Sequence, residues 1–171
     1  MTKEEEKANP AYLADVLSKY QISTVHFVPS VLGVFLEYAK SHSLELPHLT
    51  HVFSSGEALS AELVKVFYEL FPKADIHNLY GPTECTIDVT YYDCTGKETE
   101  IPIGKPVFFT KAEILGADGK KQPRGIEGEL VIFGPLVGEG YVGEQSGGFF
   151  VGEDGKEKRY YTKDHAVLGY D

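Results

Sequence analysis

The seven residues Asn-Leu-Tyr-Gly-Pro-Thr-Glu at positions 78–84 combine side chains that suit nucleotide chemistry. The flat ring of Tyr80 can stack on a base, and the Gly-Pro turn after it exposes backbone groups. A carboxylate such as Glu84 fits beside a phosphate only when a hard cation, for example Mg²⁺, lies between them. By composition alone, these residues also suit an ordinary turn in which Thr83 and Glu84 cap the next element.

Three short runs of β-branched and aromatic residues indicate strands, at positions 24–28, 51–54 and 74–80. Apolar residues at helical spacing lie between these runs. Strands separated by amphipathic helices predict a parallel sheet with right-handed crossovers. Open α/β sheets bind their ligands at the carboxyl ends of the strands, which is where the candidate nucleotide site lies.

The helices of this part have recognisable starts. Asn9, followed by Pro10, is a predicted N-cap. Ser30 and Ser60 are the predicted N-caps of the next two helices, because a serine hydroxyl accepts a hydrogen bond from a free backbone N–H. Pro72 is expected to end the third helix.

The pattern changes near residue 100. Residues 111–115 and 129–133 are short alternating runs that indicate strands, and Ala-Asp-Gly at 117–119 is typical of a turn. No comparable helical pattern lies among them. The fold class expected is α/β, with a parallel α/β subdomain at 1–100 followed by a small β-rich, barrel-like subdomain at 101–171.

Composition and charge narrow the class of protein. The 171 residues carry 16 Lys and Arg against 26 Asp and Glu, a net charge of −10. Such an acidic chain is unsuited to non-specific binding of nucleic acid or anionic membranes. Two cysteines are too few for a disulfide framework, and the sequence has neither a secretory signal pattern nor a run of about 18 apolar residues. A soluble cytoplasmic protein is expected, with no nucleic-acid or membrane partner.

Three further segments accompany the candidate nucleotide site: SSGEALS at 54–60, a GELVIFG…GY stretch within 127–141, and YYTKD at 160–164. In this order and at about this spacing, the four segments resemble the amino-acid adenylation domains of nonribosomal peptide synthetases, which are adenylate-forming enzymes. The resemblance extends over nearly the whole chain and corresponds to roughly the middle third of such a domain. Four ordered motifs are far more specific than any one of them.

The resemblance implies a role for each matching residue. Tyr80 would stack on adenine, and Asn78 would bond the amino edge of the base. Thr83 would contact the α-phosphate, Glu84 would bind Mg²⁺, and Asp164 would accept hydrogen bonds from the two ribose hydroxyls. The nucleotide site implied also includes Gly56, Glu57, Leu79 and Gly81.

The reaction implied by the resemblance is attack of an amino-acid carboxylate on the α-phosphate of ATP. It yields aminoacyl-AMP and pyrophosphate, mostly through positioning and neutralisation of phosphate charge. The aminoacyl group would then pass to the phosphopantetheine thiol of a carrier protein. Partners implied are therefore the amino acid, the carrier protein and the neighbouring synthetase domains.

The sequence also departs from the family pattern. Lys163 occupies a position where the family has glycine. Glycine permits backbone conformations that lysine rarely adopts, so the backbone conformation that leads into Asp164 is in doubt. The 171 residues contain neither the glycine-rich phosphate loop expected upstream nor the domain with a catalytic lysine expected downstream. We expect the isolated chain not to activate an amino acid.

Positions that line the amino-acid pocket in the family have a polar character here. The set resembles that of serine-activating domains: His26, Ser55 and Asp88 suit hydrogen bonding to a small hydroxyl. A pocket of this kind rejects analogues that lack the hydroxyl, because its buried polar groups then go unpaired. Taken singly, His26 is equally well a satisfied histidine on a buried strand, and Asp88 a loop carboxylate. The residues expected to limit the pocket volume are Phe53, Leu79 and Ile87.

Two alternatives stay open at this point. The chain also fits another adenylate-forming ligase, such as an acyl-CoA synthetase, although a fatty-acid tunnel would hardly place His26 and Asp88 together. A non-catalytic role, as an excised or degenerate subdomain that folds or binds a partner, is the alternative from a different class. The missing phosphate loop favours that second alternative.

Overall fold

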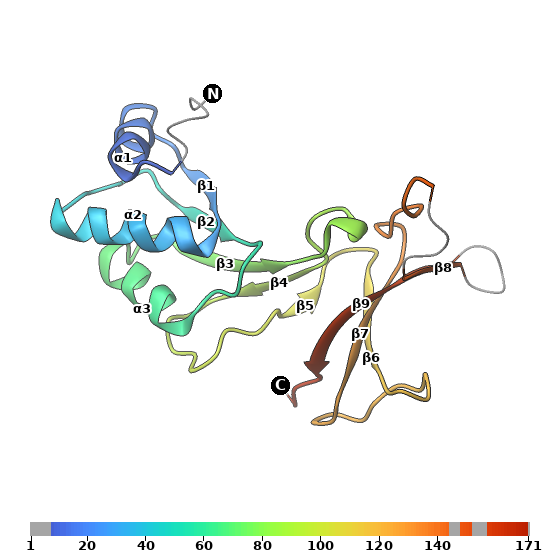
Figure 1. The fold of residues 1–171 in the computed structure, drawn as a ribbon. Helices are drawn as coiled ribbons and strands as arrows, with labels where there is room; N and C mark the ends of the chain where they lie inside the picture. Colours follow the sequence, from blue (N-terminus) through green and yellow to red (C-terminus); the bar gives the residue numbers. More distant parts are fainter. Residues whose placement is uncertain (1–7, 144–147, 152–156, 171) are drawn as a thin grey trace. The chain divides into compact units, whose positions relative to one another are not determined.

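The computed structural model describes residues 8–143, 148–151 and 157–170. The chain forms two compact units (Figure 1). One unit comprises the chain up to Tyr80 together with Tyr91–Gly104. The other comprises Gly81–Thr90 together with the chain from Lys105 onward, so the segment after the candidate nucleotide motif belongs to the second unit.

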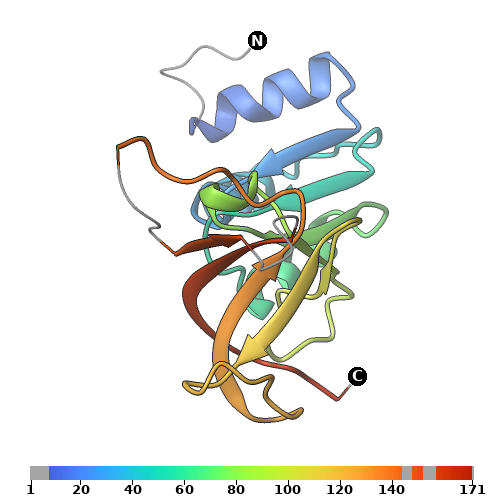
Figure 2. The ribbon, with the colours of Figure 1, turned by 90° about the vertical axis from the view of Figure 1, so that its right-hand side faces the viewer.

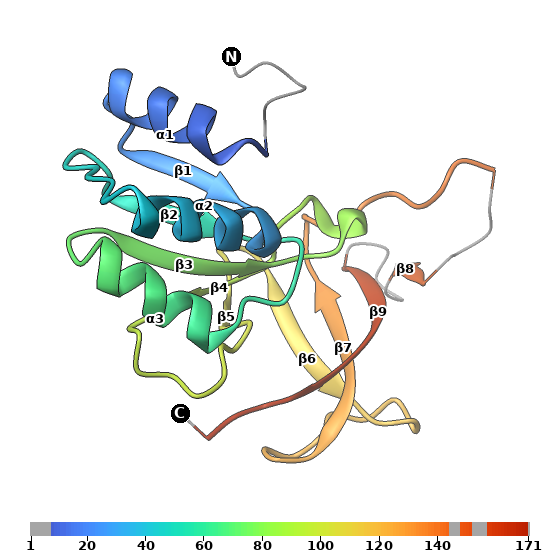
Figure 3. The same cartoon turned by 60° about the vertical axis from the view of Figure 1, so that its left-hand side comes forward.

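The first unit is a parallel α/β layer, as the sequence predicts. Strand β1 pairs in parallel with β2, and β2 pairs in parallel with β3, so that His26, Phe53 and His77 lie side by side in the register. Helices α2 and α3 lie next to one another over one face of the sheet (Figures 1 and 3). The elements are α1 (Pro10–Lys19), β1 (Thr24–Phe27), α2 (Pro29–Ser41), β2 (His51–Ser54), α3 (Ala61–Leu70), β3 (Asp75–Tyr80) and β4 (Thr90–Asp93).

Two of the three predicted helix starts are confirmed. The Asn9 side chain caps α1 by accepting from the N–H groups of Ala11 and Tyr12, at 3.1 and 3.4 Å. Ser60 caps α3 by accepting from the Leu63 N–H at 3.2 Å. Helix α3 ends at Leu70, two residues before proline.

The prediction that Ser30 caps α2 is wrong. The helix begins two residues earlier than that cap would require, at Pro29, with Val28 as an N-cap that makes no side-chain hydrogen bond. Ser30 instead donates from its backbone N–H and its hydroxyl to the Glu57 carboxylate, at 2.9 and 3.0 Å. A carboxylate at a helix N-terminus satisfies a free N–H and interacts favourably with the helix dipole. The cap of α2 therefore comes from a residue distant in sequence.

The core of the first unit lies between its helices and its sheet. Leu32 and Leu36 of α2, Phe67 of α3, Val52 of β2 and Ile76 of β3 are each at most 1% exposed. They belong to one continuous cluster that also includes residues of α1. Burying each such side chain contributes about 1.5–3 kcal/mol, so apolar burial dominates the stability of this unit.

The second unit is built mainly from an antiparallel sheet of order β6-β7-β9-β8, which confirms the expected small antiparallel arrangement. Strands β7 and β9 bend strongly along their length (Figure 2). Gly119 has a φ of +72°, as the predicted turn requires. No helix among the described residues is long and apolar enough to cross a bilayer. The elements are the 3₁₀ turn η2 (Thr83–Cys85) and strands β5 (Lys105–Pro106), β6 (Lys111–Leu115), β7 (Glu127–Phe133), β8 (Phe149–Val151) and β9 (Lys158–Val167).

Candidate functional site

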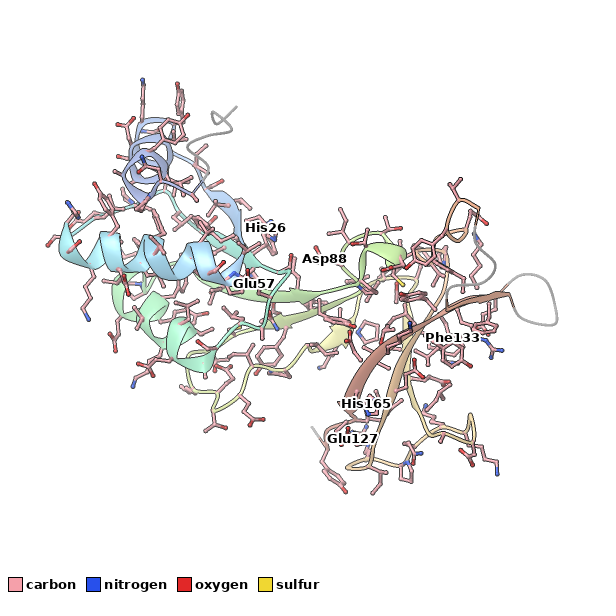
Figure 4. All side chains as sticks on the ribbon, viewed as in Figure 1. His26, Glu57, Asp88, Glu127, Phe133 and His165 are labelled. Atoms are coloured by element: carbon pink, nitrogen blue, oxygen red, sulfur yellow. The ribbon has the colours of Figure 1, made fainter. Side chains whose placement is uncertain are left out.

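In the first unit, predicted pocket residues gather where the parallel strands end. Ser55 directly follows β2, and its buried side chain hydrogen bonds to His26 of β1, with 2.8 Å between Oγ and Nε2. The Ser55 N–H donates to the Phe27 carbonyl at 3.3 Å, which extends the pairing of the two strands by one residue. Figure 4 labels His26, which lies on β1, and Glu57, which lies in the turn after β2. The structure thus brings His26 and Ser55 together, as a linked pair of hydrogen-bonding groups.

The third pocket residue of this unit, Phe53, is fixed by its neighbours on the sheet. Its ring stacks on His77 of β3, with centroids 4.9 Å apart and an interplanar angle of 25°. His77 is itself anchored, because its Nδ1 lies 2.6 Å from the Asp93 carboxylate and its Nε2 lies 3.2 Å from Nδ1 of His51. The Phe53 ring is therefore supported by a hydrogen-bonded chain across three strands.

Strand β3 ends with three residues of the nucleotide motif. Asn78 is 5% exposed, and its Nδ2 donates to the Pro102 carbonyl at 2.9 Å. This contact orients the amide, so that its oxygen is the group directed to other partners. Leu79 and Tyr80 are half-buried and complete the strand.

The rest of the motif belongs to the second unit and forms a tight turn. A Cβ at Gly81 would lie only 2.0 Å from the Ile87 carbonyl oxygen, so no larger residue fits there. Thr86 and Ile87 both have positive φ, at 59° and 78°, which is costly for β-branched residues. Burial of the Cys85 thiol raises its pKa to about 11, which makes it a packing residue rather than a nucleophile.

Glu84 is held through both its side chain and its backbone. The Tyr141 hydroxyl donates to the Glu84 carboxylate. This hydrogen bond is the main cause that lowers the pKa of Glu84, and Tyr160 contributes in the same direction. The Gly138 N–H donates to the Glu84 carbonyl at 2.8 Å. The carboxylate is therefore half-buried, oriented and ionised near neutral pH.

The donors present suit a magnesium ion shared with a phosphate ligand. Within residues 8–143, 148–151 and 157–170, no group of three or more His, Cys, Asp and Glu side chains is arranged to hold a metal ion. Glu84 supplies one oriented carboxylate. Mg²⁺ usually keeps several waters and binds one or two carboxylates together with substrate phosphates. The site fits that mode and does not fit a cation enclosed by protein alone.

Asp164 lies at an irregularity of the second sheet. The register of β7 and β9 shifts between Glu129 and Val131, and Lys163 has a φ of +65° at this point. The Lys163 N–H donates to the Glu129 carboxylate at 3.0 Å, and the Asp164 N–H donates to the Thr162 hydroxyl at 3.1 Å. The backbone thus takes the left-handed conformation that glycine prefers, although lysine occupies the position.

The remaining predicted residues are placed as follows. Gly56 has a φ of +86° and opens the turn after β2, next to Glu57, which caps α2. Thr83 is exposed at the start of η2, and Asp88 is half-buried in the loop that follows. Ile87 is 67% exposed. His26, Phe53, Ser55, Gly56, Glu57, Asn78, Leu79 and Tyr80 belong to the first unit, and Gly81, Thr83, Glu84, Ile87, Asp88 and Asp164 to the second.

Sequence reasoning missed the two tyrosines that act on Glu84. Tyr141 and Tyr160 both lie at the edge of a recognised motif, the first ending the GELVIFG…GY stretch and the second opening YYTKD. Their positions within the motifs therefore indicated that the two tyrosines belong to the site. Nothing local indicated that these two rings meet a carboxylate more than 50 residues earlier.

Comparison with known proteins points to one family. A family model described as "AMP-binding enzyme" matches residues 1–142. The chain is 42% identical over 137 residues to a plipastatin synthase of Bacillus subtilis, covering 78% of this chain and 4% of that protein. It is 41% identical over 138 residues to a phosphinothricin tripeptide synthetase of Streptomyces viridochromogenes, covering 79% and 11%. Identity to enterobactin synthase component F of Escherichia coli is 36% over 151 residues, covering 84% and 12%. The chain thus spans only about a tenth or less of the length of these relatives.

Solved structures share the fold. An NRPS protein containing adenylation and PCP domains superposes with a TM-score of 0.82 at 24% identity, covering 94% of this chain and 34% of that one. A long-chain-fatty-acid-CoA ligase from Archaeoglobus fulgidus gives 0.82 at 22% identity, covering 94% and 35%. The architecture is therefore the adenylate-forming enzyme fold over about a third of its length.

Proposed function

This chain belongs to the AMP-binding enzyme family, and from that premise we propose that its residues bind ATP and an amino acid in an enzyme that forms aminoacyl-AMP. The amino acid would then be loaded onto the phosphopantetheine of a carrier protein, alongside neighbouring synthetase domains. The observation that carries the proposal is the nucleotide motif at the carboxyl end of parallel strand β3, where α/β sheets bind ligands. Identity of 36–42% to peptide synthetases supports the reaction class.

We assign the base of the nucleotide to the end of β3. The Tyr80 ring would stack on adenine, and the oxygen of Asn78 would accept from the adenine amino group. The hydrogen bond from Asn78 Nδ2 to Pro102 supports this role, because it occupies the nitrogen of the amide and not its oxygen. Gly56, Glu57, Leu79 and Gly81 would shape the backbone around the nucleotide.

The phosphate and ribose would be bound by residues of the second unit. Thr83 is exposed at the start of η2 and would donate its hydroxyl to the α-phosphate. Glu84 would bind Mg²⁺, which supplies charge neutralisation at the phosphates when bound. Asp164 would accept hydrogen bonds from the ribose hydroxyls, since a carboxylate offers two acceptors to vicinal donors.

We propose L-serine as the amino acid. His26 and Ser55 already form a polar pair at 2.8 Å, and with Asp88 they would hydrogen bond the substrate hydroxyl. Phe53, Leu79 and Ile87 would limit the size of the side chain. A substrate without a hydroxyl would form none of these hydrogen bonds, each of which contributes about 0.5–1.5 kcal/mol.

An acyl-CoA ligase is the second candidate, because one such enzyme shares the fold with the same TM-score of 0.82. The polar pair of His26 and Ser55 argues against it, because an alkyl chain offers neither group a hydrogen-bond partner. A non-catalytic role predicts instead that neither nucleotide nor amino-acid analogues bind.

Nucleotide binding is tested by titrating AMP into the chain and measuring heat of binding. Tyr80→Ala is expected to weaken binding, because base stacking on an aromatic ring contributes about 1–3 kcal/mol. Tyr80→Phe keeps the ring and is expected to bind nearly as tightly as the unchanged chain. Tyr20→Ala, at a tyrosine 64% exposed after α1, is the matched control and should bind as the unchanged chain does. Equal binding by Tyr80→Ala and Tyr20→Ala would contradict the assignment.

Amino-acid selectivity is tested with non-hydrolysable aminoacyl-adenylate analogues, which report binding without requiring turnover. The seryl analogue is expected to bind more tightly than the leucyl analogue. Ser55→Ala is expected to reduce this preference several-fold, whereas Thr24→Ala, an exposed hydroxyl on β1, should leave it unchanged. Tighter binding of the leucyl analogue would contradict the assignment of serine.

A further inference from the structure

The Glu84 carboxylate is contacted by two tyrosines that the nucleotide motif does not contain. Tyr141 lies in the segment that follows β7, and Tyr160 lies in β9. We propose that Tyr141 and Tyr160 are positioning residues that orient the Glu84 carboxylate for a divalent cation. This inference rests on the proposed function of Glu84 as the Mg²⁺ ligand.

The two tyrosines form one packed aromatic group with Phe149 of β8. The ring of Tyr141 meets Phe149 edge-on, with centroids 5.4 Å apart and an interplanar angle of 82°. Phe149 in turn packs on Tyr160, with centroids 4.9 Å apart. Tyr160 is only 7% exposed. A tyrosine ring that is packed against other rings has already lost much of its rotational freedom. It therefore loses little more conformational entropy when its hydroxyl donates a hydrogen bond, and the group is a preorganised donor.

The same loop also holds the backbone around Glu84. The Gly138 N–H donates to the Glu84 carbonyl at 2.8 Å. Two residues after Glu84, the Thr86 hydroxyl donates to the Leu136 carbonyl at 2.8 Å. The segment that carries Tyr141 therefore fixes both the main chain and the carboxylate of Glu84.

This arrangement suits a metal ligand better than a simple structural contact. Tyr141 donates to Oε1 of the carboxylate. A neutral phenol restricts rotation of the carboxylate without neutralising its charge. Groups that orient a metal ligand in this way change metal affinity by about 10–100-fold when they are removed. Because Glu84 is only half-buried, we expect an effect near the lower limit.

The test measures Mn²⁺ affinity in the presence of ATP, by electron paramagnetic resonance of the free ion, for the whole chain and its variants. Glu84→Gln removes the proposed ligand and should abolish the protein-dependent Mn²⁺ binding. Tyr141→Phe should weaken it about 5–10-fold while leaving ATP affinity in EDTA unchanged. Tyr160→Phe is expected to act in the same direction. Tyr170→Phe, at a tyrosine 78% exposed, is the matched control and should behave as the unchanged chain.

The possible results separate this inference from the proposed function. Weaker Mn²⁺ binding in Tyr141→Phe, with metal-free ATP affinity preserved, supports the positioning role. If Glu84→Gln loses the ion but Tyr141→Phe binds it as tightly or more tightly, only the positioning role is overturned. If metal-free ATP affinity falls equally in Tyr141→Phe, its role is structural and the inference is wrong. Unchanged Mn²⁺ binding in Glu84→Gln would overturn the metal role of Glu84 itself, and this inference with it.

Discussion

The two units of this chain are stabilised in different ways. In the first unit, the buried side chains of three helices and the sheet form one continuous hydrophobic cluster. In the second unit, a smaller cluster consists of Leu115, Val131 and Phe133 with Tyr161 packed against it. Phe108 and Phe109 of this unit are 84% and 78% exposed. The first cluster thus joins helices to a sheet, whereas the second joins neighbouring strands of one sheet.

Backbone strain is distributed in the same uneven way. In the first unit, the non-glycine residues with positive φ follow helix ends, where a left-handed residue is common. Of the four described in the second unit, two lie two and three residues after Glu84, one lies directly before Asp164, and Phe109 lies in the turn before β6. Strained conformations gather at functional sites, where the surrounding structure enforces them. The residues are Gln21 and Ser43 in the first unit, and Thr86, Ile87, Phe109 and Lys163 in the second.

Truncation of equivalent leucines tests the difference in core most directly. Leu36→Ala, at a residue 1% exposed in α2, is expected to cost about 3–5 kcal/mol of unfolding free energy. Leu115→Ala, at a residue 7% exposed in the smaller cluster, is expected to cost about 2 kcal/mol, because fewer neighbours surround the space it leaves. Hydrogen exchange measured amide by amide reports each unit separately. Equal losses would show that the two cores contribute alike.

The first unit also contains a network of polar contacts around Glu98, which is half-buried. Burial raises the pKa of Glu98, but hydrogen bonds from Thr95 and Tyr92 outweigh it, so that the pKa lies at about 2. Thr95 donates from its N–H and its hydroxyl, at 2.7 and 2.8 Å. A carboxyl whose pKa is lowered on folding stabilises the folded state above its ordinary pKa of 4.5. That contribution is lost as the pH falls from 4.5 towards 2.

Glu98→Gln is therefore expected to cost about 2 kcal/mol at pH 7, since hydrogen bonds to a charged group are among the stronger ones. Denaturant unfolding at pH 7 and at pH 3 measures the effect, and the variant should show a flatter pH dependence than the unchanged chain. Glu100→Gln, at an exposed carboxylate in the same loop, is the control. Identical pH profiles for the unchanged chain and Glu98→Gln would rule out this contribution.

The first unit was also the part that sequence predicted best. Its strands, their parallel order and the caps at Asn9 and Ser60 follow from local patterns, because each depends on residues within one or two turns. Ser30 failed as a cap because Pro29 already begins the helix, and the acceptor for its N–H comes from Glu57, 27 residues away. Local propensity contains no information about such a distant partner.

The same reasoning explains what was missed in the second unit. The position of Glu84 in a motif was evident, but its contact with Tyr141 joins residues 57 positions apart. The departure from family pattern at Lys163 raised doubt about the backbone, yet the sheet irregularity imposes the left-handed conformation on lysine all the same. The motif that contains Glu84 could be recognised from the sequence, whereas the contact that orients its side chain could not.

Removing the Glu57 carboxylate that caps α2 tests whether this polar contact contributes to the stability of the first unit. Glu57→Ala leaves the Ser30 N–H without its carboxylate partner and is expected to cost about 1 kcal/mol, as for the loss of other helix caps. Ser30→Ala keeps the N–H contact and loses only that of the hydroxyl, so it should cost less. Thermal unfolding followed by circular dichroism measures both. Glu45→Ala, at an exposed loop glutamate, should leave the transition unchanged. A shift of equal size in that control would exclude a specific capping effect.

Lys163→Gly tests whether the positive φ of this one residue lowers the stability of the second unit. The φ of +65° at Lys163 costs a non-glycine residue about 1 kcal/mol, a cost that glycine avoids. Glycine also gains entropy in the unfolded chain, which offsets about half of that benefit. The variant keeps the N–H that donates to Glu129, so we expect a net stabilisation of about 0.5 kcal/mol in denaturant unfolding.

Ala166→Gly in the same strand is the control for this substitution. Ala166 pairs with Gly128 in the regular part of the ladder, where glycine is expected to cost about 0.5–1 kcal/mol. If Lys163→Gly raises the free energy of unfolding and Ala166→Gly lowers it, the strain lies at residue 163, next to the proposed ribose ligand Asp164. A loss of similar size at both positions would mean that the sheet accommodates Lys163 without strain, and that the two units differ in their cores alone.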